Sequence, residues 1–419
     1  MFSSLATAAS PPASEERAYG QFDFPTCVRY AFTHADAFLK NRIQIQLKSV
    51  DLKDAHADIL PTLTVTTRYY LQRPEGFEDR NPFSVDFSMA NWNPYLALLK
   101  IKSQGLMVDV ARLNHFDKLS SGVREIARLF FAIDLQDRTL KASRQSLAMY
   151  RNKLNYGESL SQQGKMDAVA LRTLANQARQ QSLRVKEIER DKEDNVAKLK
   201  VLLGYHPDYH LPLDTRDAVD QILAGFNGRG VTFADVQAEN WQLKMAAKKE
   251  QLQGCAVTGS YVAILPQPMF LLEGLSNQVD RSSGVSISVG LNYTLWDGFK
   301  RVRDIKRQKL NAEIARIERD NLSKELYTSF RKILNEIETS AERESLRRED
   351  AKLSELSEEK AYVQYKAGEL PLDSYLDHKI KRTEASIQAI SALQQRVGAL
   401  LELATMAGGL NRYNGRIGY

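Results

Sequence analysis

The sequence predicts an α+β chain made mainly of long α-helical hairpins, with four β-strands, in which one structural unit occurs twice. Proline is absent from 95 to 206 and again from 269 to 370, and because an internal proline costs a helix about 3 kcal/mol, these gaps permit very long helices. Short segments elsewhere alternate strictly between apolar and polar residues, which is the period of a strand with unlike faces. Five short matches recur at nearly one offset along the chain, which indicates an internal duplication.

The duplication has a period of about 204 residues, as a self-comparison for repeats shows. The matching pairs are Ile59-Leu60-Pro61 with Ile264-Leu265-Pro266, Trp92-Asn93-Pro94-Tyr95 with Trp296-Asp297-Gly298-Phe299, Ile101-Lys102 with Ile305-Lys306, Gly164 with Gly368, and Gly204 with Gly408. We therefore expect an N-terminal tail over 1–23, which is a possible signal remnant, and a first repeat over 24–204. A connector over 205–230 leads to a second repeat over 231–408, and a C-terminal tail follows over 409–419.

Each repeat is expected to begin with a helix, over 24–57 and 232–254, and to continue with two strands. In the first repeat the strands are expected at 59–71 and 83–89, where Phe83, Val85 and Phe87 alternate with polar residues. In the second repeat they are expected at 261–272 and 285–295. The segment 261–272 is the weaker one, because Pro266 and Pro268 interrupt it and a proline cannot donate to a sheet ladder.

The strands are followed by the longest helices, which we expect over 95–156 and 299–365. About 60 residues at 1.5 Å each would span roughly 90 Å. Each helix is interrupted near a glycine, Gly164 or Gly368, and a returning helix is expected after it, over 167–203 and 372–406. The result is two antiparallel helical hairpins longer than the core of an ordinary domain.

Composition excludes several classes of protein. The 58 basic and 52 acidic residues leave a formal charge of only +6 over 419 residues, and they interleave along the helices, which is typical of a solvated helical face and not of a nucleic-acid surface. No run approaches the roughly 18 to 20 apolar residues of a membrane-spanning helix. Alternating strands give a much weaker signal, so a membrane β-barrel remains open at this point.

The sequence predicts no catalytic, cofactor-binding or metal site. It contains neither a phosphate-binding glycine loop nor a nucleophile elbow, and Pro207 keeps His206 and His210 from sharing a helical face. Cys27 and Cys255 are expected at opposite ends of two leading helices, about 35 Å apart if those helices lie side by side, which is too far for a disulfide.

Four strands cannot close a barrel, and an open strand edge is not tolerated in lipid. Strands that face lipid therefore require several chains to share one barrel. At this point the chain resembles the TolC family of outer-membrane channels over about residues 24–410. The resemblance rests on the duplicated plan, on Ile-Leu-Pro before a strand pair, on Leu295-Trp-Asp-Gly298 at a strand exit, and on Tyr365-Lys-Ala-Gly368 at a hairpin tip.

The resemblance implies a homotrimer in the outer membrane of a Gram-negative bacterium. Its twelve-stranded β-barrel, in contact with outer-membrane lipid, would continue into a periplasmic α-barrel closed by the hairpin tips. The implied partners are a periplasmic adaptor (membrane fusion) protein and an inner-membrane RND or ABC transporter, with no nucleic acid. The chain would then be the passive exit duct of a tripartite efflux pump or a type I secretion system, and it would open when the tips spread.

The resemblance also carries residue roles to matching positions. The tips, with the adaptor-docking positions, are Gly164, Lys165, Gly368, Glu369 and Leu370; the periplasmic aperture is Asp167, Tyr365, Asp373 and Asp377; and the junction of strand and helix is Trp92, Pro94, Trp296, Asp297 and Gly298. One of the family's aperture acids falls on Ser374 here, beside Asp373. The acids could instead be solvated carboxylates at helix starts, where the helix dipole favours them.

A second class of function stays open at the level of sequence. A soluble coiled-coil scaffold, with the alternating segments as capping hairpins, has the same helical periodicity and no channel activity. The scaffold predicts a monomer or dimer that needs no detergent, whereas the channel predicts a trimer that does.

Overall fold

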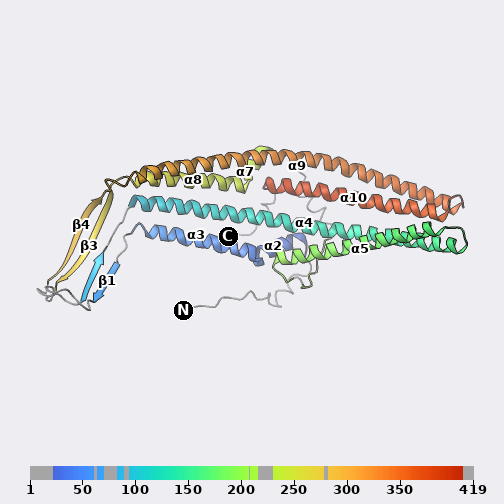
Figure 1. The fold of residues 1–419 in the computed structure, drawn as a ribbon, viewed down its shortest axis with the longest axis horizontal. Helices are drawn as coiled ribbons and strands as arrows, with labels where there is room; N and C mark the ends of the chain where they lie inside the picture. Colours follow the sequence, from blue (N-terminus) through green and yellow to red (C-terminus); the bar gives the residue numbers. More distant parts are fainter. Residues whose placement is uncertain are drawn as a thin grey trace. The chain divides into compact units, whose positions relative to one another are not determined.

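The computed structural model describes residues 22–60, 64–69, 83–88, 94–206, 208–215, 230–277 and 282–408. Within them, two long helical hairpins and two strand pairs alternate along the chain (Figure 1). The elements are α2 (Phe24–His34), α3 (Asp36–Ala57), β1 (Thr64–Tyr69), β2 (Phe83–Ser88), α4 (Pro94–Gln162), α5 (Ala168–Leu203), α7 (Phe233–Glu239), α8 (Trp241–Val262), β3 (Gln267–Asn277), β4 (Ser282–Asn292), α9 (Lys300–Lys366) and α10 (Leu372–Met406).

The order of element types is therefore the same in the two halves of the chain: broken leading helix, strand pair, long helix and returning helix. The expected long helices are confirmed within a few residues, at 69 and 67 residues. None of the described helices combines the length and the apolar character that crossing a membrane requires. The duplication of the sequence itself remains a prediction.

By their contacts, the described residues form two compact units. The first, which we call the hairpin unit, lies within Met1–Leu39, Phe116–Asn240 and Glu325–Tyr419, and it contains both hairpin tips. The second, the strand unit, lies within Lys40–His115 and Trp241–Lys324. Helices α4 and α9 contribute to both units, so each long helix serves two separate packing environments.

The strand unit contains two antiparallel strand pairs. In the first, Thr64 of β1 lies opposite Ser88 of β2; in the second, Gln267 of β3 lies opposite Asn292 of β4. Strand β2 also packs beside β3. Four strands are present near the expected positions, although Ile59 and Leu60 lie in a turn after α3 and not in the first strand as expected. Each pair is closed by hydrogen bonds between consecutive strands of the chain.

Two expected boundaries in the second repeat are wrong. Tyr261 is helical, because α8 continues to Val262. The helix ends shortly before Pro266, in keeping with the bias of a residue before proline away from the helical conformation. Strand β3 then begins at Gln267 and tolerates Pro268 opposite Leu291. Strand β4 ends at Asn292, so Tyr293 and Leu295 lie in the turn that follows it and not in the expected strand.

Each leading helix is divided by one extended residue, where a single helix was expected. Ala35 (φ −70°, ψ 126°) separates α2 from α3, and Asn240 (φ −74°, ψ 117°) separates α7 from α8. Helix α7 starts in a capping box in which Thr232 and Asp235 bond each other's backbone amides, an arrangement that satisfies two otherwise unpaired donors.

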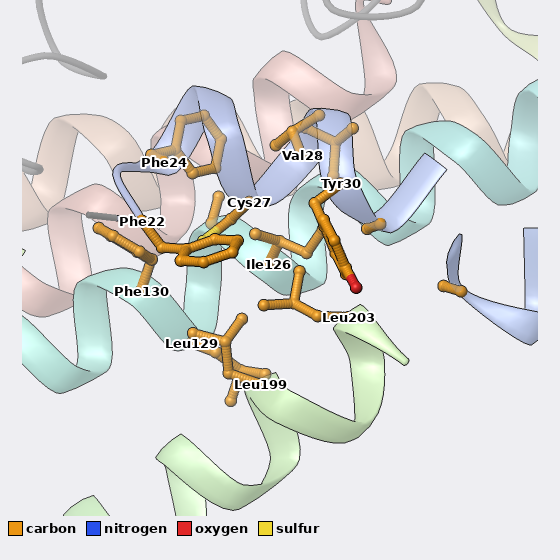
Figure 2. Packing of buried hydrophobic residues seen from close by; sticks show 14 of the residues in the cluster. Phe22, Phe24, Cys27, Val28, Tyr30, Ile126, Leu129, Phe130, Leu199 and Leu203 are labelled. Atoms are coloured by element: carbon orange, nitrogen blue, oxygen red, sulfur yellow. The ribbon is translucent and has the colours of Figure 1, made fainter. Parts of the chain in front are cut away.

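Helix α2 organises the core of the hairpin unit. Asp23 caps it by accepting a hydrogen bond from the amide of Thr26 at 2.9 Å, and its apolar face packs on α4 and α5 (Figure 2). The labelled side chains of this cluster are Phe22, Phe24, Cys27, Val28, Tyr30, Ile126, Leu129, Phe130, Leu199 and Leu203. Val397, Leu401 and Ala404 of α10 complete it. One short helix thus ties both hairpins together by burying apolar surface.

Cys27 lies at the centre of this core with no exposed surface. Burial, with the negative charge of Asp23, raises the pKa of the thiol to about 12. Both Cys27 and Cys255 are free thiols. A protonated, enclosed Cys27 thiol acts as a small apolar side chain, since only the thiolate is a good nucleophile.

Candidate gate at the hairpin tips

The two hairpins reverse through the same backbone device. At the first tip the amides of Gly164 and Lys165 donate to the carbonyls of Ser161 and Leu160; at the second, the amides of Gly368 and Glu369 donate to Tyr365 and Gln364. This paired pattern is the Schellman motif, which needs a left-handed residue after the helix. Gly164 (φ 69°) and Gly368 (φ 78°) supply it, at the two positions that the sequence identified as tips.

Replacing either tip glycine by alanine should destabilise the fold through the backbone alone. A methyl group at Gly164 or Gly368 would meet no atom within 4 Å, so the cost is that of a left-handed alanine, about 1 to 2 kcal/mol. Thermal unfolding of each variant measures it. Gly105→Ala is the control: its site inside α4 is equally open, and a helical alanine should stabilise by about 0.5–1 kcal/mol. Equal effects at all three sites would contradict this account.

The predicted aperture acids differ in what holds them. Asp167 is the N-cap of α5 and accepts a hydrogen bond from the amide of Ala170 at 2.6 Å. Asp373 lies in the first turn of α10, where the helix dipole favours a carboxylate. Asp377 lies one turn further along α10, on the same face as Asp373. All three thus stand at helix starts, and only the two on α10 lie together.

Lys153 of α4 joins Asp373 and Asp377. Its Nζ lies 2.7 Å from Oδ1 of Asp377 and 3.2 Å from Oδ1 of Asp373. The side chain of Lys153 is only 13% exposed, whereas both carboxylates are nearly half exposed. Burial lowers the pKa of Lys153, but hydrogen bonds and charge attraction from Asp377 and Asp373 outweigh it and hold that pKa above its ordinary value. One half-buried cation of the first hairpin therefore clamps the start of α10 in the second.

A second contact lies beside the Lys153 clamp. The hydroxyl of Tyr150 donates to Oε1 of Glu384 at 3.4 Å. Burial, and then the charge of Glu384, raises the pKa of the Tyr150 phenol. Tyr150 and Lys153 are three residues apart on α4, and therefore share a face of that helix. Both side chains point from the first hairpin to the second.

Tyr365 packs within its own hairpin. Its ring stacks on that of Tyr375, with centroids 5.1 Å apart and planes 8° apart. The Tyr375 hydroxyl donates to buried Glu358 at 3.3 Å, and Arg382 donates to the other oxygen of Glu358 at 2.8 Å. This network crosslinks the last turns of α9 to the first turns of α10, so that the second tip is a firmly closed hairpin.

The remaining predicted positions are placed as follows. Gly164, Lys165, Gly368 and Glu369 are exposed at the tips, and Leu370 is half buried. At the strand–helix junction, Pro94 is the first residue of α4, and Trp296, Asp297 and Gly298 form the turn between β4 and α9. Trp92 lies outside the described residues. The junction belongs to the strand unit and the tips belong to the hairpin unit, so they are two separate sites.

Sequence reasoning missed Lys153, Tyr150 and Tyr375. Lysine and tyrosine are common on long polar helices, and the repeat offset places Ser357, a residue of different chemistry, opposite Lys153 in the second copy. No signal in the sequence marks these residues. His206 and His210 are exposed, and no group of three or more His, Cys, Asp or Glu residues within the described chain could hold a metal ion.

No family model matches the sequence, and no curated protein matches it either. Solved structures nevertheless share its fold over nearly the whole chain, and outer-membrane channels are among them. One is a membrane protein from Pseudomonas aeruginosa, with a TM-score of 0.77, 15% identity and 92% of both chains covered.

Two further structures are channels by name. The CmeC outer-membrane channel of Campylobacter jejuni has a TM-score of 0.74 at 13% identity and covers 92% of this chain and 85% of its own. The MtrE outer-membrane channel of Neisseria gonorrhoeae, solved in its open state, has a TM-score of 0.74 at 11% identity, with 92% and 88% covered. The resemblance in fold to the TolC-like channels is therefore confirmed, whereas the low identity carries no residue roles.

Proposed function

We propose that this protein is the outer-membrane exit channel of a tripartite efflux pump or type I secretion system, and that it conducts substrates passively from a periplasmic pump complex to the exterior. The observation that carries the proposal is the joining of two strand pairs to two hairpins of 35 to 69 residues per helix in one chain. Channels with this fold match more than nine tenths of the chain.

An apolar seam on α9 supports an assembly of several chains. Leu346, Leu353, Leu356 and Val363 are all more than half exposed, at spacings of seven, three and seven residues. This is the a and d spacing of a coiled coil, whose apolar residues a partner helix normally covers. Three copies would cover the seams and bring twelve strands together, which satisfies the requirement that a barrel in lipid have no open edge.

The gate in this proposal is the set of contacts between the two hairpins of each chain. Asp373 and Asp377, with Tyr365 one turn before the tip, would line the aperture of the closed trimer, and Lys153 would hold α10 in the closed position. Opening would break the Lys153 and Tyr150 contacts while the bonds within each hairpin persist. Such a transition is a change between two packings, as in other switching proteins.

The exposed tips are the proposed docking positions for the periplasmic adaptor. Lys165 and Glu369 present opposite charges beside the two tip glycines, and Leu370 adds an apolar edge. An adaptor that binds the spread tips more tightly than the closed ones would shift the channel toward the open state, because a ligand moves an equilibrium only by its differential affinity.

The test is to purify the full chain from membranes in detergent, crosslink it, and record its current in planar bilayers. We expect a trimer with low conductance at rest, which rises when the tips are released. If the protein is instead a monomer or dimer that stays in solution without detergent and carries no current, the proposed channel is wrong and the coiled-coil scaffold takes its place.

A further inference from the structure

Large apolar side chains are exposed at the end of the strand unit where the helices meet the strands. In the turn between β4 and α9, Leu295 is 89% exposed, Trp296 71% and Phe299 58%. Leu60, which follows α3, is also exposed, as are Tyr95 at the start of α4 and Tyr261 at the end of α8. Tryptophan is usually well buried, and a contiguous exposed apolar patch indicates a binding surface.

The backbone holds the two largest of these side chains side by side. The rings of Trp296 and Phe299 meet edge to face, with centroids 4.9 Å apart. Gly298 (φ 64°) and Phe299 (φ 63°) are both left-handed, and Phe299 is the only described residue other than glycine with positive φ. A bulky residue rarely adopts this conformation. Asp297 closes the turn by accepting hydrogen bonds from the amides of Lys300 and Arg301.

Directly beside the apolar patch lies an excess of positive charge. Six of the ten residues from Lys300 to Lys309 are basic, and Asp304 is the one acid. The positive end of the helix dipole disfavours cations at this position. Asp304 pairs with Arg307, and Asp297 with Arg301. Lys300, Arg303 and Lys306 are exposed and form no ion pair with any residue in the described part of the chain.

We propose that this junction binds the headgroups of anionic phospholipids in the inner leaflet of the outer membrane. The inference rests on the proposed function. Trp296, Phe299 and Leu295 would enter the boundary between headgroups and acyl chains, where aromatic residues are favoured. Lys300, Arg303 and Lys306 would reach the phosphates through their flexible stems. Asp297 already occupies the backbone amides of the helix start, so the side chains alone make the phosphate contacts.

An aqueous anionic partner explains less of this surface. A nucleic acid or an acidic peptide would pair with the three cations and leave the aliphatic Leu295 in water. A lipid surface satisfies both halves of the patch at once: apolar side chains toward the membrane interior and cations at the phosphate level. Each basic residue near an anionic membrane surface contributes attraction of this kind.

The experiment uses the fluorescence of Trp296 in the full-length protein reconstituted into vesicles. The vesicles contain either brominated phosphatidylglycerol in unlabelled phosphatidylcholine, or brominated phosphatidylcholine in unlabelled phosphatidylglycerol, at equal bromine content. Bromine quenches only nearby indoles, and subtracting the signal of a Trp296→Phe variant removes that of Trp92 and Trp241. We expect brominated phosphatidylglycerol to quench Trp296 more strongly, which would report enrichment of the anionic lipid around the junction.

A charge variant and a matched control distinguish binding at this site from a general electrostatic attraction between the basic protein and anionic lipid. The triple change Lys300→Gln, Arg303→Gln and Lys306→Gln should lower the enrichment about tenfold or more, since three membrane-surface cations are lost. The triple change Arg331→Gln, Lys332→Gln and Lys352→Gln removes the same charge from exposed positions at least about 40 Å along the same helix, and should leave the enrichment unchanged. The thermal unfolding temperature of the variant with the three junction changes should not fall, because the helix dipole disfavours the positive charges that these changes remove.

Four outcomes would overturn the inference. Equal quenching by both brominated lipids would show that the junction does not prefer anionic headgroups, and equal loss in both triples would show that the attraction is not local. Absence of quenching by either lipid, in vesicles where the protein carries current, would place the junction away from the membrane while the proposed channel stands. Failure of the protein to insert or conduct at all would overturn the proposed function, and this inference with it.

Discussion

Replacing Lys153 by methionine should raise the resting conductance of the proposed channel after reconstitution. The change keeps the length of the side chain and removes the cation that Asp373 and Asp377 share at 3.2 and 2.7 Å. A hydrogen bond to a charged group contributes about 1.5–3 kcal/mol, and the half-exposed carboxylates place this clamp near the lower end. The equilibrium should therefore shift toward the open state by about tenfold per chain, measured as open probability in planar bilayers.

Lys192→Met provides the control for Lys153→Met. Lys192 pairs with Asp137 at 2.5 Å, but both residues belong to the first hairpin, so this bond does not join the two hairpins. The control variant should stay closed. A double-mutant cycle with Asp373→Asn and Asp377→Asn completes the test: once Lys153 is gone, neutralising the acids should have little further effect on open probability. Additive effects would mean that Lys153 and the acids act independently.

Titration of Lys153 should change the stability of the clamp only at alkaline pH. The pKa of Lys153 is higher in the folded chain than its ordinary value of 10.5. The stabilisation that is linked to the raised pKa of Lys153 is therefore complete below about pH 10.5 and is lost as the pH rises through the raised pKa. Between pH 6 and 9, titration of Lys153 should leave the conductance unchanged.

Replacing Glu344 by alanine should loosen the second hairpin. Glu344 is 1% exposed in α9. Arg396 of α10 donates to its Oε2 at 2.6 Å, and Nη2 of Arg348 approaches its Oε1 at 2.5 Å without hydrogen-bond geometry. Arg396 is 40% exposed and Arg348 is 62% exposed, so water screens the charges left behind, and losing the carboxylate costs about 1.5–2 kcal/mol, the lower part of the range for a hydrogen bond to a charged group. Amide hydrogen exchange in peptides around 344 and 396 should accelerate by about tenfold or more, where opening of this region limits exchange.

Two further variants distinguish an unpaired charge from a general defect of α9. Glu349→Ala removes an exposed carboxylate five residues away and should leave exchange unchanged. The double change Glu344→Met and Arg396→Met replaces both partners by apolar side chains, which can be nearly neutral, and should recover most of the protection. If the double variant exchanged as fast as Glu344→Ala, the loss would come from packing and not from charge.

Most of the fold could be predicted from local properties of the sequence. The absence of proline predicted α4 and α9, the tip glycines predicted both reversals, and strict alternation predicted β1, β2 and most of β4. These are backbone properties, since proline, glycine and the period of side chains act over a few residues whatever the rest of the chain does. The prediction was wrong where two signals competed, as at Tyr261. The repeat predicted a strand at this position, but helix α8 continues through it because no proline or other helix-ending residue comes before Pro266.

The sequence by itself determined where the chain is helical, where it reverses and where its strands pair, because each of those choices is made by neighbours along the chain. Only the tertiary structure decided which charges meet. Asp373 and Asp377 were visible as acids near a tip, but their partner lies more than 200 residues earlier, and no period or motif links Lys153 to them. Ion pairs between distant helices depend on how the hairpins pack, and that packing is set by the apolar core around α2 and not by the polar residues that it brings together.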